Sequence, residues 1–127
     1  MPCTGSGVVR RHPDIKWVRR TTDTAKFVVQ QARLLEGVWP TLKKGGQLLY
    51  VTCSIFHEEN QDVVAAFLAK NSDAKLKPIT VVSAEEAHNT GISSGISDGA
   101  EKSKAIGQQL LPDVMTDGFY YALIEKA

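Results

Sequence analysis

Two cysteines are the residues of this chain whose type and position best suit covalent chemistry. Cys53 directly follows the apolar stretch 47–52 and precedes a serine, so it stands where a buried strand ends and a loop begins. In open parallel sheets, ligands bind just beyond the carboxyl ends of the strands, where a rigidly held thiol can face a substrate. Cys3 lies in a second turn, close before Gly5 and Gly7. Since cysteine is also common as a small core residue, position alone leaves a packing role open.

A basic segment follows the first cysteine. Residues 1–20 contain five lysines and arginines against one aspartate, although the whole chain has a formal net charge of only +1. Such a segment beside a cysteine loop suits contact with a phosphate backbone, whereas short cationic runs are also common as solvated surface. Both readings stay open at this point.

Composition excludes several classes of protein. A chain of 127 residues is about one domain, and we expect a single one over 1–127. Two cysteines without the spacing of metal ligands argue against a zinc site and against a disulfide framework. No apolar stretch reaches the ~20 residues that a membrane-spanning helix needs, and the amino terminus lacks the pattern of a signal peptide. We therefore expect no metal, reduced thiols and a cytoplasmic location.

The apolar periodicity predicts an α/β domain. Three-residue and four-residue spacing predicts helices, and short apolar runs bounded by turn residues predict strands. The predicted helices cover 23–39 and 58–70, and the predicted strands cover 47–52, 75–82 and 118–126. Because the run 47–52 is apolar without alternation, we expect a sheet covered on both faces. Residues 83–107 are rich in serine and glycine, and we expect a flexible surface loop there.

An ordered series of short blocks runs through nearly the whole chain. The blocks are Pro2-Cys3-Thr4-Gly5-Ser6-Gly7, Arg10-Arg11-His12-Pro13-Asp14-Ile15-Lys16-Trp17, the stretch 42–54, Glu59-Asn60, Gly107-Gln108-Gln109-Leu110-Leu111-Pro112 and Asp117-Gly118-Phe119-Tyr120. In type, order and spacing they resemble the carboxyl-terminal half of the Sun/Fmu (RsmB) type ribosomal RNA cytosine-5 methyltransferases. The resemblance implies the carboxyl-terminal portion of a Rossmann-like, S-adenosylmethionine-dependent catalytic domain, with about three strands and two or more helices.

The resemblance also implies separate roles for the two thiols. In the family pattern the nucleophile lies in the Thr-Cys-Ser block, here Cys53, and forms a covalent adduct with C6 of cytosine. The cysteine of the Pro-Cys block, here Cys3, assists release of the product. Because a free thiol is mostly protonated near neutrality, we expect nearby cations or N–H groups to lower the pKa of the nucleophile. The RNA contacts that the resemblance favours are Arg10, Arg11, His12 and Lys16.

Three further features of the blocks receive structural interpretations. Glu59 and Asn60 suit the start of a helix, where acidic and amide side chains are common. Asp117 and Gly118 suit the turn into the last strand. Trp17 is expected to pack, with stacking on a base as the less favoured reading.

The chain departs from the family pattern at its first residue. Met1 stands where the family has alanine, and the preceding aspartate, the glycine-rich cofactor loop and the acid that grips the ribose are not in these 127 residues. We therefore expect no cofactor-binding residues here, a separate amino-terminal half of the catalytic domain as partner, and no turnover by this chain alone. An unpaired edge of the strand 47–52 would also invite self-association.

Two other functional classes stay open. A DNA cytosine-5 methyltransferase would use the cysteine of the Pro-Cys block as nucleophile, here Cys3, and the Thr-Cys-Ser block argues against it. A non-catalytic module that binds or complements RNA machinery would use the basic segment alone, and its binding would weaken steeply with salt.

Overall fold

The computed structural model describes residues 1–79, 106–114 and 116–127. Three helices and four strands make up the described part, together with short 3₁₀ turns at Ser6–Val8, Trp39–Thr41 and His57–Glu59. The elements are α1 (Ile15–Val18), α2 (Asp23–Val38), β1 (Gln47–Thr52), α3 (Gln61–Lys70), β2 (Ala74–Lys77), β3 (Gln108–Leu110) and β4 (Phe119–Lys126). The α/β class is confirmed, and so are both long helices and the strands β1, β2 and β4.

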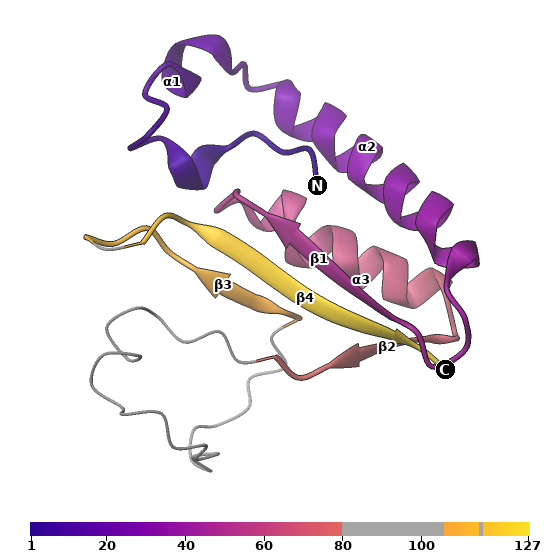
Figure 1. Cartoon of the computed structure of the whole chain (residues 1–127). Helices are drawn as coiled ribbons and strands as arrows, with labels where there is room; N and C mark the ends of the chain where they lie inside the picture. The colour runs from indigo at the N-terminus through magenta and orange to yellow at the C-terminus, as the bar shows by residue number, and fades with distance from the viewer. Residues whose placement is uncertain (80–105, 115) are drawn as a thin grey trace, which may run out of the picture.

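The last strand, β4, lies in the middle of the sheet. It pairs antiparallel with β1 on one side, where Gln47 is opposite Glu125 and Thr52 is opposite Tyr120. On its other side it pairs antiparallel with β2 and β3 (Figure 1). The parallel sheet that the position of Cys53 suggested is therefore wrong for the described strands. Among those strands β1 pairs only with β4, and the amino group of Met1 donates to Val51 O at 3.0 Å on its open edge.

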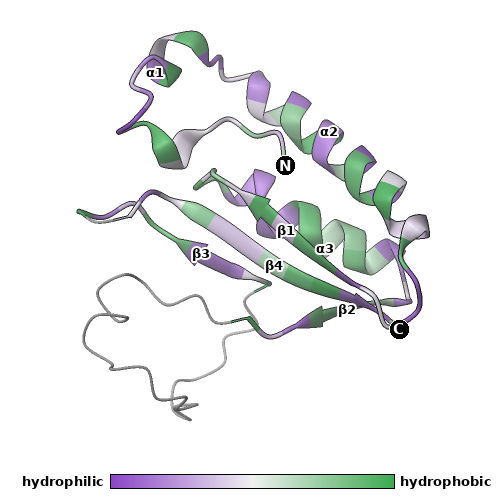
Figure 2. Ribbon diagram, in the orientation of Figure 1, coloured by the Kyte–Doolittle hydropathy of each residue, from purple (hydrophilic) through white to green (hydrophobic). Residues whose placement is uncertain are grey.

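Both long helices cover the same face of the sheet (Figure 1). The buried core joins Leu35 of α2 and Phe67 of α3 to Tyr50 of β1 and Ile124 of β4. Figure 2 shows α2 striped with polar and apolar residues and α3 more uniformly apolar. On the opposite face Leu49 is 53% exposed, so the expected cover on both faces is wrong for the described part. The reason is that α2 and α3 pack on one side.

Several boundaries differ from the predicted ones. Helix α3 begins at Gln61, not at residue 58, because the two residues before it use their side chains elsewhere, as described below. Strand β2 ends before Pro78, which has no N–H for the ladder. Residues 80–82 of that predicted strand lie outside the described residues, as does the predicted loop 83–107 except for its last two. Strand β3 was not predicted because three residues are too few to show a period.

No helix in the described ranges is long and apolar enough to cross a membrane.

Candidate active site

The structure brings the two cysteines together although 50 positions separate them in the sequence. Cys3 Sγ and Cys53 Sγ are 3.1 Å apart, and both residues are half-buried. Neither takes part in a disulfide. Cys53 follows β1 at the end of the sheet where the loop of Cys3 also lies. Two thiols this close together can act on the same atom of a bound substrate.

Backbone contacts hold three loops against one another beneath the thiols. The amide of Gly7 donates to Cys53 O at 2.8 Å, and the amide of Gly118 donates to Gly7 O at 2.8 Å. A Cβ added at Gly7 would lie 2.2 Å from Gly118 O and 2.9 Å from Cys53 O. No side chain fits into that space without moving backbone atoms. The backbone of the Cys3 loop thus approaches that of the Cys53 loop so closely at Gly7 that only glycine fits there.

Glu59 ties together the residues that follow each cysteine. Its side chain is fully buried, and it accepts hydrogen bonds from the Thr4 amide at 2.9 Å and the Thr4 hydroxyl at 2.6 Å. It also accepts from the Ser54 hydroxyl at 2.5 Å. Because Thr4 follows Cys3 and Ser54 follows Cys53, one carboxylate fixes both thiol loops. The sequence interpretation of Glu59 as the start of a helix missed this position.

Asn60 binds the residues on both sides of Cys53 and so holds Cys53 in place. Asn60 Oδ1 accepts from the Thr52 hydroxyl at 2.5 Å, and Asn60 Nδ2 donates to Ser54 O at 2.8 Å. The same amide donates to Gln109 Oε1 at 2.7 Å, and Gln109 Nε2 donates to Ser54 O at 3.2 Å. Since its side chain is used in this way, Asn60 makes no side-chain cap for α3. The late start of α3 is thus coupled to the geometry of the site.

The environment of Cys53 favours the neutral thiol. Burial raises its pKa from 9.0 to about 11, with further increases from the hydrogen bond and the charge interaction with Cys3. The amino group of Met1 opposes this rise only weakly. The expectation that nearby cations would lower this pKa is therefore wrong for the described residues. Near neutral pH, Cys53 is therefore almost entirely the neutral thiol in this environment.

The predicted RNA contacts occupy two different environments. Arg10 Nη2 and Arg11 Nε pair with the two oxygens of Asp117 at 3.1 and 2.7 Å. The side chain of Asp117 is only 4% exposed, whereas the arginines are 49% and 68% exposed. His12 and Lys16 are exposed and form no ion pair within the described part of the chain. Asp117 was expected only to mark a turn, and no pattern in the sequence indicated that it pairs with two arginines.

The two glycine-containing turns do not fit a cofactor cradle. The Gly7 amide is used by Cys53 O, and the amides of Gly45 and Gly46 donate to Lys126 O and Lys43 O. A phosphate or carboxylate ligand would need such amides to be free. The amides of Gly7, Gly45 and Gly46 are therefore not available to hold such a ligand.

Comparisons with known proteins place this geometry in a family. The family model for the 16S rRNA methyltransferase RsmB/F matches residues 1–125. The chain is 43% identical over 126 residues to ribosomal RNA small subunit methyltransferase B of Yersinia enterocolitica and 44% identical to that of Klebsiella pneumoniae. In each case the match covers 98% of this chain and 24% of the relative.

A solved structure supports the same assignment. The chain superposes on a methyltransferase homolog protein from Pyrococcus horikoshii with a TM-score of 0.66 and 30% identity. That match covers 99% of this chain and 37% of the other. The chain thus spans about a quarter of the length of the curated relatives that it matches. With a match of the family model over nearly its full length, the chain belongs to the 16S rRNA methyltransferase RsmB/F family.

Proposed function

We propose that this chain supplies both thiols of an RNA cytosine-5 methyltransferase acting on ribosomal RNA. The observation that carries the proposal is the 3.1 Å separation between Cys3 Sγ and Cys53 Sγ, held by buried hydrogen bonds on both sides. The family relatives named as small-subunit rRNA methyltransferases support the RNA substrate and the methyl transfer.

The thiol chemistry follows from the electronic structure of cytosine. C5 is a weak nucleophile, and a thiolate that bonds to C6 makes it electron-rich. Cys53 Sγ forms this bond, and the bond breaks again after a base removes the proton from C5. Cys3 assists that release, because its sulfur lies against Cys53 Sγ. S-adenosylmethionine supplies the methyl group in this scheme and is held by residues outside this chain.

The chain alone is proposed not to turn over. The amides of Gly7, Gly45 and Gly46 are occupied by backbone carbonyls, so these turns offer no free N–H groups to the methyl donor. Burial also raises the pKa of Cys53, which leaves little of the reactive thiolate near neutral pH. Methyl transfer to RNA by the purified 127-residue chain would contradict this part of the proposal.

The experiment that tests the thiol roles uses a chimera. This chain replaces the equivalent residues of the Yersinia enterocolitica relative, and RNA that contains 5-fluorocytidine is added with S-adenosylmethionine. Fluorine at C5 cannot leave as a proton, so the covalent adduct persists and can be mapped by mass spectrometry. We expect the adduct on Cys53, its loss in Cys53→Ser, and its retention in Cys3→Ser. On RNA with ordinary cytidine, where the C5 proton can leave, Cys3→Ser should release the product slowly and accumulate the same adduct. An adduct on Cys3 would instead indicate the chemistry of the DNA enzymes.

RNA contact by the basic segment is the second part of the proposal. Arg10, Arg11, His12 and Lys16 all lie within one exposed stretch beside the loop of Cys3. Binding through such cations weakens steeply between about 50 and 200 mM salt, and a flat response would dismiss them as RNA contacts. If RNA binds but the chimera shows no adduct, the non-catalytic RNA-binding module becomes the better reading.

Two further features of the chain support proposals about its state. Free thiols 3.1 Å apart require reducing conditions to stay free, which fits the cytoplasm. Among the described residues, the edge of β1 that β4 does not occupy is open apart from the contact of Met1. Self-association through this edge would raise the mass measured by light scattering as concentration increases, and a constant monomer mass would exclude it.

A further inference from the structure

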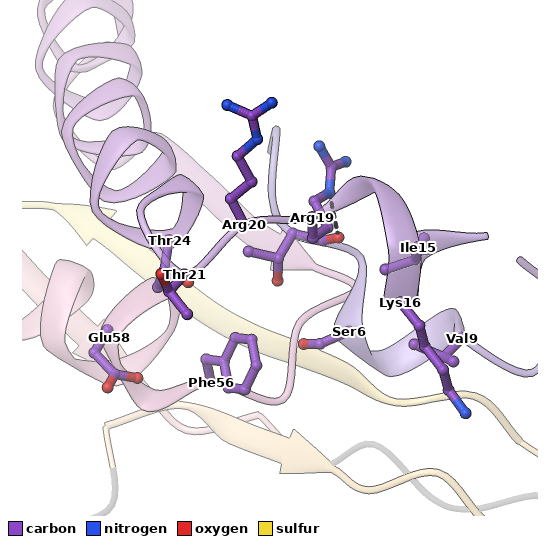
Figure 3. Close-up of a pocket in the computed structure, with 11 residues that line it drawn as sticks. Ser6, Val9, Ile15, Lys16, Arg19, Arg20, Thr21, Thr24, Phe56 and Glu58 are labelled. Atoms are coloured by element: carbon purple, nitrogen blue, oxygen red, sulfur yellow. Dashed lines mark hydrogen bonds between the residues drawn. The ribbon is translucent and has the colours of Figure 1, made fainter. Parts of the chain in front are cut away.

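A cavity of about 510 Å³ opens next to the thiol loops (Figure 3). It lies between the loop that follows Cys3, helix α1, the first residues of α2 and the turn after β1. Its size falls within the range of pockets that bind small organic ligands. Nothing in the thiol chemistry described above occupies it.

The floor of the cavity is aromatic and is held by hydrogen bonds from the two loops that carry the cysteines. Phe56 lies on the floor between Ser6 and Glu58, with Thr24 of α2 and Thr21 of the turn before α2 beside it (Figure 3). The Phe56 ring is 41% exposed.

Two hydrogen bonds hold the segment that carries this ring. The Phe56 amide donates to Ser54 Oγ at 3.1 Å, and the Ile55 amide donates to Ser6 Oγ at 3.0 Å. Because Ser54 also binds Glu59, the aromatic floor and both cysteines share one scaffold.

The rim of the cavity is cationic. Lys16, Arg19 and Arg20 line it, against the single carboxylate of Glu58. Arg19 donates to Thr4 O at 2.9 Å and is thereby fixed beside the loop of Cys3. The side chains of Lys16 and Arg20 form no hydrogen bond or ion pair among the described residues. Unlike Arg10 and Arg11, these two cations are free to bind an anion.

An exposed aromatic floor with free cations at its rim is the combination that binds single-stranded nucleic acid. Bases stack on aromatic rings while lysine and arginine contact the phosphates, and duplex RNA hides its bases from such a pocket. We propose that this cavity receives the base of a nucleotide that adjoins the target cytosine in single-stranded RNA. Phe56 contacts the base, and Lys16 and Arg20 contact its phosphates. This inference rests on the proposed function, since it deepens the RNA site beside the thiols.

The test measures RNA binding by the chain itself. The probe is a short single-stranded oligoribonucleotide with cytosine at its centre, and the signal is the fluorescence of Trp17. That side chain is 88% exposed and adjacent to Lys16, whereas Trp39 is 4% exposed and gives a constant background. The variants are Phe56→Ala, Phe56→Tyr and the double variant Lys16→Gln with Arg20→Gln. Lys44→Gln is the matched control, because Lys44 is an exposed cation in the turn before β1.

The expected losses follow from stacking and from ion release. Phe56→Ala weakens binding roughly five- to 160-fold, the range for loss of one stacked base, while Phe56→Tyr keeps the ring and binds like the unaltered chain. The double variant makes the negative slope of log K against log salt shallower by about 0.7 for each cation removed. Lys44→Gln leaves affinity within about twofold, because its charge lies away from the cavity.

Four results would overturn the proposal. They are no binding of the oligoribonucleotide at about 50 mM salt, equal affinities for Phe56→Ala and the unaltered chain, a salt slope unchanged in the double variant, and cytidine monophosphate binding as tightly as the oligonucleotide. The last result would assign the cavity to a free nucleotide. Failure of the thiol roles is distinguishable, because the adduct on 5-fluorocytidine tests Cys53 without reference to Phe56.

Discussion

The two thiol loops and the rim of the neighbouring cavity hold their polar groups in opposite ways. Around the thiols, Glu59 and Asn60 are fully or almost fully buried, and each binds groups from both sides of the site. At the rim, Lys16 and Arg20 are exposed and unpaired among the described residues. Geometry near the reacting atoms is thus fixed before substrate arrives, while charges that meet a polyanion stay free to adapt. The basic segment divides along the same line, since Arg10 and Arg11 are already bound to buried Asp117.

The largest expected effect comes from removing the buried carboxylate. Glu59→Ala leaves the Thr4 amide and the Thr4 and Ser54 hydroxyls without their acceptor, and we expect the free energy of unfolding to fall by about 3 kcal/mol or more. Urea denaturation measures the loss. Glu58→Ala is the matched control, because Glu58 is exposed and its loss changes stability by less than about 0.5 kcal/mol. Equal midpoints for the two variants would refute the role assigned to Glu59.

The second prediction tests the close approach of backbones beneath the thiols. Gly7→Ala forces a Cβ against Gly118 O, where only 2.2 Å is available, and we expect a loss of about 1 to 3 kcal/mol. Gly37→Ala is the control, since its added Cβ meets nothing within 4 Å inside α2 and stabilises that helix by about 0.5 to 1 kcal/mol. Opposite shifts in melting temperature are therefore expected for two identical substitutions. Shifts of the same sign would contradict the structure.

The third prediction concerns pH. The pKa of Cys53 is raised to about 11 from 9.0, so the folded state holds this proton more tightly than the unfolded state does. Stability from this group is fully present below about pH 9 and is lost as pH rises to about 11. Alkylation of Cys53 by iodoacetamide, followed by peptide mass spectrometry, should increase over the same range.

A second thiol variant identifies the cause of that shift. Cys3→Ala removes the hydrogen bond and the charge interaction that contribute to it, so the midpoint for Cys53 should fall while remaining above the ordinary value because burial persists. A titration midpoint of Cys53 at or below pH 9 in the unaltered chain would show that the thiol is already activated.

The smallest effects on stability should come from the basic segment. Arg11→Gln breaks an ion pair whose arginine is 68% exposed, so we expect a loss below about 1 kcal/mol. Lys16→Gln breaks no pair within the described part and should be neutral within about 0.5 kcal/mol. For RNA affinity the order should reverse: the Lys16→Gln variant should bind RNA more weakly than the Arg11→Gln variant. If Arg11→Gln weakened RNA binding more than Lys16→Gln did, the RNA phosphate site would lie at the arginines that pair with Asp117.

Local patterns in the sequence predicted the elements well and the site only in part. The spacing of apolar residues located α2 and β4 closely, because periodic burial leaves a direct trace in the chain. The same patterns could not give the pairing of β1, since an apolar run has no direction relative to its neighbour. They also placed the start of α3 three residues early, because Glu59 and Asn60 look like helix residues but bind to distant loops.

What the sequence by itself determined is the set of chemical groups and their local order. It supplied a thiol after a strand, a second thiol in a glycine-containing turn and a family pattern that links them. Only the tertiary structure decided that Cys3 and Cys53 touch, that burial raises the pKa of Cys53, and that Asp117 pairs with Arg10 and Arg11. The physical reason is that burial and long-range hydrogen bonds join residues about 50 to 100 positions apart, where no local periodicity exists.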